Sequence, residues 1–382
     1  MKMKYQFITI LITLAISSCG HLMGNKQKIA ADTTLFIGSK QYSWEDTNRL
    51  DEYYEETRKV NVQIWYPSNK VTSSSLRTPY LLFGEKLYNQ LEGWSEADYE
   101  SVQKVKTASL LDIPIKENLT KAPLLIFSPS LGGNLSYYTY YAEYFAKKGY
   151  IVMGINHLYE SEAVVANDKV YLANHSFQDS LKSLKIPDDI SAEQYRELMG
   201  VRQKVLAQDI QFSLDQLLAD ERIRSAIDTS KIGIFGHSVG GAGAVYCSIL
   251  DKRIKVVINL DGTPPSIALN NGIDIPYLFI EDLTDYKYHE GYAIQYKRRS
   301  DFCELNRADS WRVLIKGFNH NSFLDINYYL AENTSKSQSE KANLDKIISY
   351  MDDFLNHYLL GNDELHIMPF ESESLEIIGF DK

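Results

Sequence analysis

The feature that most constrains the fold of this chain is a glycine-rich turn between an apolar run and a run of small residues. Residues 232–241 read Ile-Gly-Ile-Phe-Gly-His-Ser-Val-Gly-Gly, which places Ser238 in a Gly-x-Ser-x-Gly pattern. Glycine on both sides of a serine lets a strand and a helix approach each other around a sharp, strained turn that projects the hydroxyl group outward. The pattern predicts a strand–turn–helix unit with Ser238 as a nucleophile at the turn.

Two other interpretations of a glycine-rich turn have to be weighed. It is also found as a packing turn in unrelated α/β proteins, and that interpretation stays open. A phosphate-binding loop is disfavoured, because the chain has neither Gly-x-x-x-x-Gly-Lys-Ser/Thr nor Gly-x-Gly-x-x-Gly followed by a suitable acid. The formal net charge of -10 also repels phosphate backbones, so nucleic acid is not an expected partner.

Apolar runs alternate with helix-like segments along most of the chain. Short apolar strands, typical of a sheet buried on both faces, are expected at residues 60–66, 124–127, 151–155, 232–235, 256–260, 277–280 and 312–315. Helices are expected at residues 137–148, 202–219, 240–250 and 344–360. The alternation predicts a doubly wound, mostly parallel α/β sheet in a single domain over residues 46–382. Insertions that form lids or surface decoration are expected at about residues 71–119, 157–199 and 326–343.

The N-terminus has the pattern of an export signal. Lys2 and Lys4 precede an apolar run at residues 5–16, which is too short to span a bilayer. We predict a signal peptide at residues 1–18 and a tether at residues 19–45. Residues 16–19 resemble the lipobox of bacterial lipoproteins, which implies lipidation of Cys19 and a membrane-anchored protein in the periplasm or at the cell surface. Plain secretion with cleavage nearby is the alternative, and no oligomeric state is predicted.

Two further cysteines, Cys247 and Cys303, follow Cys19. An exported protein is able to form one disulfide from such a pair. Cys247 falls on the expected buried face of a helix, so two free thiols are the favoured interpretation.

A serine nucleophile needs a base and an acid that orients this base, and in hydrolases with this turn they follow in the order serine, acid, histidine. His320 comes directly after the strand at residues 312–315, in a loop expected on the same rim as Ser238. Other histidines are less well placed: His237 adjoins the serine, His289 lies in a loop, His357 in a helix and His366 in the tail.

The acid has more than one candidate. Asp261 ends the strand at residues 256–260 and is followed by glycine, which also suits a simple turn aspartate. Asp282 and Asp285 follow the next strand, at residues 277–280. The pattern alone does not separate them.

Together these motifs resemble the plasma-type platelet-activating-factor acetylhydrolase family, also known as lipoprotein-associated phospholipases A2. The matching pieces, spread from about residue 60 to residue 360, are Trp65-Tyr66-Pro67, Phe127-Ser128-Pro129-Ser130-Leu131-Gly132, Gly149-Tyr150-Ile151-Val152, Asn156-His157, Gly236-His237-Ser238-Val239-Gly240-Gly241, Leu260-Asp261 and His320-Asn321-Ser322-Phe323-Leu324-Asp325. The chain departs from the family at Pro129-Ser130, where His-Gly is usual, and in the segment 71–119.

The resemblance implies an α/β-hydrolase fold in which Asp261 is the acid. It also implies an oxyanion hole formed by the backbone N–H groups of Leu131 and Val239. The expected reaction is ester hydrolysis through an acyl-enzyme, with Ser238 as nucleophile and His320 as base. No cofactor is expected, and no metal-binding pattern such as His-Glu-x-x-His is present in the sequence.

The expected substrate is a small-molecule or lipid ester, in particular a short-chain acyl ester such as a platelet-activating-factor-like phospholipid. The alternative within enzymes is a general carboxylesterase or polyester hydrolase acting on soluble or polymeric esters. The alternative from another class is a catalytically silent binding protein on a hydrolase scaffold. The presence of all three catalytic residue types in the expected order disfavours that last interpretation.

Overall fold

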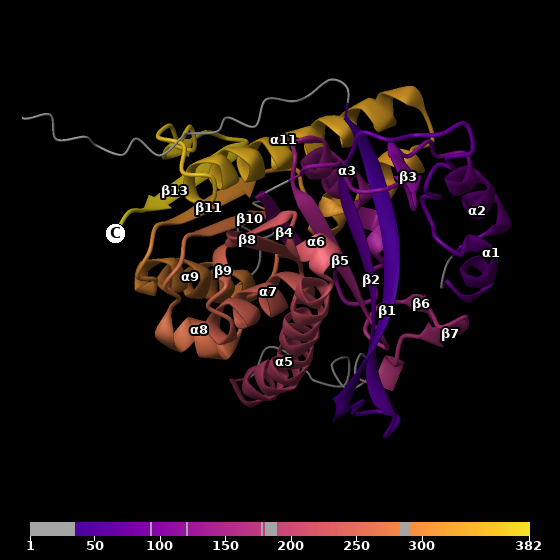
Figure 1. Cartoon of the computed structure of the whole chain (residues 1–382). Coiled ribbons are helices and arrows are strands. Elements are labelled where there is room, and N and C mark those ends of the chain that lie inside the picture. The colour runs from indigo at the N-terminus through magenta and orange to yellow at the C-terminus, as the bar shows by residue number, and fades with distance from the viewer. Residues whose placement is uncertain (1–34, 92–93, 120, 177–178, 180–188, 283–289) are drawn as a thin grey trace, which may run out of the picture.

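The computed structural model describes residues 35–382 except 92–93, 120, 177–178, 180–188 and 283–289. Its central element is a mixed sheet with the strand order β12-β13-β11-β10-β9-β8-β4-β5-β2-β1-β3 (Figure 1). These strands are β1 (Phe36–Leu50), β2 (Thr57–Ser68), β3 (Ser109–Leu111), β4 (Ala122–Ser128), β5 (Ile151–His157), β8 (Ile227–His237), β9 (Ile254–Leu260), β10 (Tyr277–Asp282), β11 (Ser310–Ile315), β12 (Phe370–Glu371) and β13 (Leu375–Phe380). A separate hairpin pairs β6 (Ala163–Ala166) with β7 (Lys169–Leu172).

The centre of the sheet is parallel, and its margins are mostly antiparallel. Strands β5, β4, β8, β9, β10 and β11 run parallel. Strand β2 pairs antiparallel with β5, β1 with β2, and β13 with β11. Helices cover both faces, so that the central strands must be apolar on both sides.

The helices are α1 (Gly84–Leu87), α2 (Glu96–Gln103), α3 (Thr139–Lys147), α5 (Asp189–Ala219), α6 (Glu221–Arg224), α7 (Val239–Leu250), α8 (Ser266–Asn271), α9 (Glu290–Leu305), α10 (Ile326–Tyr329) and α11 (Thr334–Tyr358). Short 3-10 turns are η1 (Tyr88–Gln90), η2 (Leu135–Tyr138) and η4 (His320–Phe323). Figure 1 shows α3 and α11 on one side of the sheet and α5, α7, α8 and α9 on the other.

Alternating side chains of the central strands enter two different cores. Ile258 of β9 packs in the cluster that contains Phe145 of α3 and Phe354 of α11. Its neighbour Val257 packs in the cluster that contains Leu214 of α5. This alternation is what strand geometry requires. The predicted doubly wound α/β-hydrolase fold is therefore confirmed.

Several predicted boundaries are wrong, for identifiable reasons. Residues 36–45 were assigned to the tether, yet they lie in β1, whose backbone pairs with β2 from Phe36 onward. Only four of the 15 residues of that strand are buried, so its apolar pattern is weak. Helix α11 begins at Thr334 within the predicted insertion 326–343, because Asn333 caps it by accepting from the Lys336 N–H at 2.9 Å.

The other two insertions also contain regular structure. Helix α5 begins at Asp189, inside segment 157–199, which also holds the β6–β7 hairpin. Segment 71–119 forms α1, α2 and β3, and β3 joins the edge of the main sheet by pairing with β1. This segment has its own apolar cluster, which includes Tyr80, Leu87 and Val102.

The predicted signal peptide at residues 1–18 and the lipidation site Cys19 lie outside the described residues. Within the described part of the chain, no helix has both the length and the apolar character needed to cross a membrane. Cys247 and Cys303 are free and buried, as the favoured interpretation expected.

Candidate active site

Ser238 lies at a sharp turn between β8 and α7. Its backbone has φ 58° and ψ -126°, a strained conformation for a residue with a side chain. The surrounding glycines are required by close packing. A Cβ atom on Gly236 would lie 2.4 Å from the Gly240 carbonyl carbon, and one on Gly240 would lie 2.2 Å from the Pro129 carbonyl oxygen. The predicted strand–turn–helix unit is thus present, with the glycines where strand and helix touch.

Three predicted side chains meet at this turn. The Nε2 atom of His320 lies 2.8 Å from the Ser238 Oγ atom, and its Nδ1 atom lies 2.6 Å from the Asp261 Oδ2 atom. The residues follow β8, β9 and β11, so that the carboxyl ends of three parallel strands supply them. The His320 side chain is 50% exposed, whereas that of Asp261 is 11% exposed. The Ser238 hydroxyl group is therefore in hydrogen-bond contact with an imidazole ring whose other nitrogen contacts a mostly buried carboxylate.

The backbone around Asp261 is fixed by neighbouring strands. The Asp261 N–H donates to the Ile280 carbonyl at 2.9 Å, and the Ser238 N–H donates to the Leu260 carbonyl at 2.8 Å. The rival Asp282 ends β10 and is buried, and it is Asp261 whose carboxylate contacts His320. The other rival, Asp285, lies outside the described residues.

A buried ion network lies behind the carboxylate. The Arg299 Nη1 atom is 2.7 Å from the Glu281 Oε2 atom and 3.6 Å from the Asp261 Oδ1 atom. Arg312, which is fully buried, binds the other Glu281 oxygen at 2.5 Å. The positive charge of Arg299 thus faces the acid from the side away from His320.

The two N–H groups expected to bind an oxyanion both lie beside the serine turn. Val239 is the first residue of α7, and Leu131 follows the end of β4. Among the described residues, no protein acceptor is recorded for either N–H group. Both side chains pack in one small apolar cluster with Met199 and Leu206 of α5.

The remaining histidines have other environments. His237 is buried, and its Nδ1 atom lies 2.8 Å from the Tyr138 hydroxyl group. Burial, reinforced by the neighbouring His320, lowers the pKa of His237 to about 3. His357 lies on α11, the Nδ1 atom of His366 contacts Asp353 at 2.7 Å, and His289 lies outside the described residues.

Sequence reasoning missed several residues that build the site. The Tyr138 hydroxyl group accepts from the Ser130 N–H at 3.1 Å and also contacts His237, so it joins the Leu131 loop to the serine turn. Arg299 comes from a helix far from Asp261 in the sequence. A lone tyrosine or arginine carries no pattern, so only the spatial arrangement identifies them. In the described part of the chain, no group of three or more His, Cys, Asp or Glu side chains is arranged to hold a metal ion.

Comparisons with known proteins show which family the chain resembles. Residues 45–352 match the family described as platelet-activating factor acetylhydrolase, isoform II. The platelet-activating factor acetylhydrolase of Cavia porcellus is 25% identical over 258 residues, which cover 64% of this chain and 58% of that protein. A probable 1-alkyl-2-acetylglycerophosphocholine esterase of Arthroderma benhamiae is 23% identical and covers 68% of this chain and 66% of that protein. This chain thus spans between about half and two thirds of the length of its curated relatives.

Among solved structures, a ferulic acid esterase from Streptomyces cinnamoneus superposes with a TM-score of 0.71 at 20% identity. The superposition covers 93% of this chain and 99% of that one, and it shows a shared fold. The family match spans most of the described residues and includes Ser238, Asp261 and His320. The chain therefore belongs to the platelet-activating factor acetylhydrolase, isoform II, family.

Proposed function

We propose that this protein is a serine hydrolase of carboxylic esters that acts through an acyl-enzyme. The observation that carries the proposal is the continuous path from the Ser238 hydroxyl group through His320 to the Asp261 carboxylate, with both contacts at hydrogen-bond distance. The membership of the family and the names of its curated relatives support ester hydrolysis as the reaction.

The reaction follows from where protons lie in this path. The Ser238 Oγ atom attacks the ester carbonyl carbon while the His320 Nε2 atom takes its proton. The Nδ1–H group of His320 donates to Asp261, which holds the ring in the productive tautomer and stabilises the imidazolium ion. His320 then gives the proton to the leaving alcohol. A water molecule then attacks the acyl carbon while His320 takes its proton, and His320 returns this proton to the Ser238 oxygen as the acyl–Ser238 bond breaks and the carboxylic acid leaves.

The negative charge that develops on the carbonyl oxygen needs preorganised donors. The N–H groups of Leu131 and Val239 are the donors we propose, because both lie beside the serine turn without a recorded protein acceptor. Such donors contribute about 10²- to 10³-fold to kcat each.

For the substrate, we propose short-chain acyl esters, including phospholipids that resemble platelet-activating factor. The names of the relatives support this class. We also propose that the protein is exported and anchored through a lipidated Cys19, which would hold it near lipid substrates. Loss of membrane association in a Cys19→Ser variant, measured by fractionation of expressing cells, tests the anchor.

The test of the function is hydrolysis of p-nitrophenyl esters from acetyl to dodecanoyl by the wild type and by Ser238→Ala, followed by a platelet-activating-factor analogue. We expect cleavage that favours acetyl, extends to the analogue and falls at least about 10⁴-fold in the variant. Serine-dependent cleavage without activity on the analogue would indicate a general carboxylesterase. Absence of activity and of fluorophosphonate labelling in folded protein would indicate a binding protein instead.

A further inference from the structure

A second chain of polar side chains lies beneath the loop that carries Leu131. The Ser128 Oγ atom is 2.9 Å from the His157 Nε2 atom, and the His157 Nδ1 atom is 2.9 Å from the Asp209 Oδ2 atom. Arg58 donates to Asp209 through Nη2 at 2.6 Å and through Nε at 3.1 Å. All four side chains are buried, with residue exposures of 0% to 3%. We call this set the Ser128 relay.

The direction of each hydrogen bond follows from the charges at its buried end. Burial opposes ionisation of Asp209, but Arg58 together with the hydrogen bonds holds the pKa of that carboxyl well below its usual range. The carboxylate only accepts, so the Nδ1 atom of His157 carries the proton that it donates. The His157 Nε2 atom and the Ser128 Oγ atom then share one hydrogen bond at 2.9 Å. Every polar atom along the relay has a partner.

Arg58 itself is tied to several parts of the fold. Its Nη1 group donates to the Asp51 carboxylate at 2.5 Å and to the Leu158 carbonyl at 3.0 Å. The relay thus joins β2, the turn before it, the end of β5 and helix α5 to one serine at the end of β4.

That serine is where the loop of Leu131 begins. Ser128 is the last residue of β4, and its carbonyl oxygen lies 2.3 Å from the position of a Cβ atom built on Gly240. The Ser128 and Pro129 carbonyls therefore press directly on the first turn of α7, behind Val239. Movement of Ser128 would change the separation between the two N–H groups that we assign to the oxyanion.

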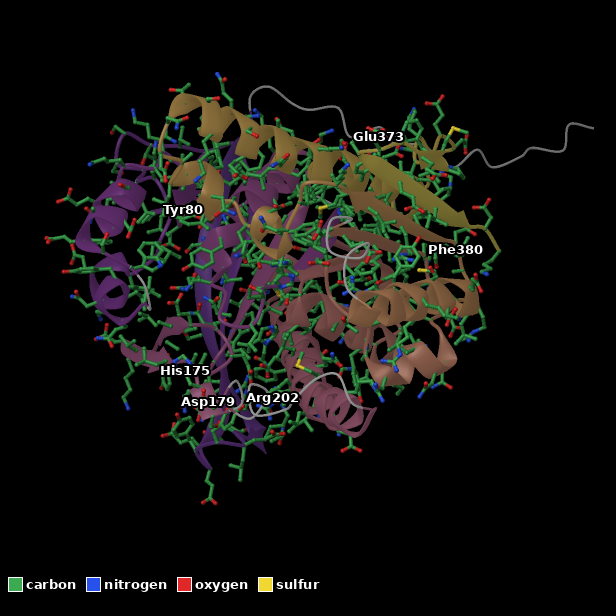
Figure 2. All side chains as sticks on the ribbon, turned by 180° about the vertical axis from the view of Figure 1, so that it is seen from behind. Tyr80, His175, Asp179, Arg202, Glu373 and Phe380 are labelled. Atoms are coloured by element: carbon green, nitrogen blue, oxygen red, sulfur yellow. The ribbon has the colours of Figure 1, made fainter. Side chains whose placement is uncertain are left out.

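The far end of the same loop is also held by a buried ion pair. The Gly132 N–H donates to the Glu160 carbonyl at 2.8 Å. The Glu160 side chain is bound by Arg202 at 2.8 Å, and Arg202 is labelled in Figure 2. Residues 128–132 are therefore fixed at both ends, with Leu131 between them.

We propose that the Ser128 relay positions the Leu131 N–H group for the oxyanion, and that Ser128 and His157 are positioning residues of the ester hydrolase. This inference rests on the proposed function. Ser128 is not a second nucleophile, because it is fully buried and cannot reach substrate. A buried ionic chain is weak as a source of stability, since well-packed apolar groups often replace one without loss. What the relay contributes is orientation, because the Ser128 hydroxyl group has a single partner among the described residues, His157, that fixes the direction of its side chain.

The experiment compares Ser128→Ala and Ser128→Cys with the wild type on p-nitrophenyl acetate. The cysteine fills the volume of the serine but is weak both as a hydrogen-bond donor and as an acceptor. The matched control is Ser213→Ala on α5, which removes a buried hydroxyl group for which no partner is recorded among the described residues. Complete reaction with a fluorophosphonate gives the concentration of active sites, and thermal unfolding reports stability.

For both Ser128 variants we expect kcat per active site to fall about 10- to 100-fold, less than the loss of a whole oxyanion donor. KM should stay within about twofold. The inhibition constant of a trifluoromethyl ketone, which forms an oxyanion on the enzyme, should rise by the same factor as kcat/KM falls. A purely structural role would instead lower the melting temperature and leave kcat per active site and the inhibition constant at their wild-type values.

The inference is overturned if both variants match Ser213→Ala in kcat and inhibitor affinity. It is also overturned if Ser128→Ala is impaired but Ser128→Cys is not, because volume rather than the hydrogen bond then matters. If Ser128→Ala does not fold, Ser128→Cys decides. Absence of Ser238-dependent hydrolysis in the wild type would overturn the proposed function and this inference together, which separates that failure from a failure of the relay alone.

Discussion

At the scale of single residues, the sequence patterns did not decide which aspartate orients His320. Asp261 contacts the His320 Nδ1 atom at 2.6 Å, so its carboxylate selects the tautomer whose Nε2 atom is able to accept the Ser238 proton. We expect Asp261→Asn to lower kcat for p-nitrophenyl acetate about 10⁴-fold, because the amide favours the wrong tautomer. Steady-state kinetics at constant active-site concentration measure the effect.

The control for that substitution is Asp282→Asn at the rival position, which ends the neighbouring strand β10. We expect its kcat to stay within about tenfold of the wild type. An equal loss in both variants, or a larger loss at Asp282, would contradict the assignment of Asp261.

The serine turn gives a second prediction at this scale. A Cβ atom on Gly240 would meet the Pro129 and Ser128 carbonyl oxygens at 2.2 and 2.3 Å, and backbone atoms cannot rotate away. We expect Gly240→Ala to lower the free energy of unfolding by at least about 2 kcal/mol and to abolish activity.

Gly200→Ala on α5 is the control, since its Cβ atom meets nothing within 4 Å. That helical substitution should stabilise by up to about 1 kcal/mol. Chemical denaturation compares them.

At the scale of elements, Asp325 joins three parts of the fold. It is buried, and its two carboxyl oxygens accept from the Tyr80 hydroxyl group at 2.5 Å and from the Tyr140 N–H at 2.7 Å. Its own N–H donates to the Tyr137 carbonyl at 2.9 Å. Asp325 lies in the segment after His320, and its carboxyl group links this segment by hydrogen bonds to the insertion 71–119, through Tyr80 (Figure 2), and to helix α3, through Tyr140.

This junction predicts an unusual pH dependence of stability. Burial raises the pKa of Asp325 from 3.8 to about 8, the two hydrogen bonds oppose the rise, and the charge of Glu143 adds to it. Between about pH 4 and pH 8 the native state therefore binds more protons than the unfolded state, so the free energy of unfolding falls as pH rises. Above about pH 8 Asp325 is ionised in both states, and the full cost of burying its charge lowers the free energy of unfolding.

We expect Asp325→Asn to remove this slope, because the amide carries a donor group and an acceptor group, as the protonated acid does, but does not ionise. Melting temperatures of both proteins from pH 5 to pH 9 test it, and their difference cancels the titration of groups that do not interact with Asp325. The melting temperature of the variant should rise relative to that of the wild type as pH rises. Parallel curves would show that Asp325 is ionised throughout.

The elements that sequence analysis predicted correctly are those with a strong local signal. The strands at the centre of the sheet are mostly apolar, because helices bury both faces, and their positions were predicted within about five residues. Strand β1 was missed because it lies near the edge and most of its residues are not buried, so its pairing with β2 rather than its own composition holds it. The start of α11 was missed because its first turns are polar, and a cap residue rather than an apolar stripe marks them.

The same distinction applies to the site. Ser238 and His320 follow strands with clear signals, and the turn pattern itself singles out the serine. Asp261 needed the family resemblance in addition, since Asp282 follows a strand just as well. The Ser128 relay was not predicted. Ser128 and His157 stand in pieces that resemble the family, but Arg58 and Asp209 lie on two other segments, and no sequence pattern joins the four side chains. Long-range hydrogen bonds of this kind have no local sequence signal.

At the scale of the whole molecule, the two internal cysteines report on the integrity of the main core. Cys247 of α7 and Cys303 of α9 are both fully buried in the apolar cluster on one face of the sheet. Burial raises the pKa of Cys303 to about 12 and that of Cys247 still higher, so thiolate is scarce while the protein is folded. A thiol reagent is therefore expected to react with each cysteine only after its helix has separated from the sheet.

We expect dithionitrobenzoate to label neither cysteine in folded Cys19→Ser protein and to label both in denaturant. Because one core holds α5, α7 and α9 on the sheet, the midpoint of labelling should coincide with the midpoint of the circular-dichroism transition. The single variants Cys247→Ala and Cys303→Ala identify which thiol reacts. Labelling of Cys303 at a lower denaturant concentration would show that α9, which carries Arg299 behind the catalytic acid, opens before the rest of the fold.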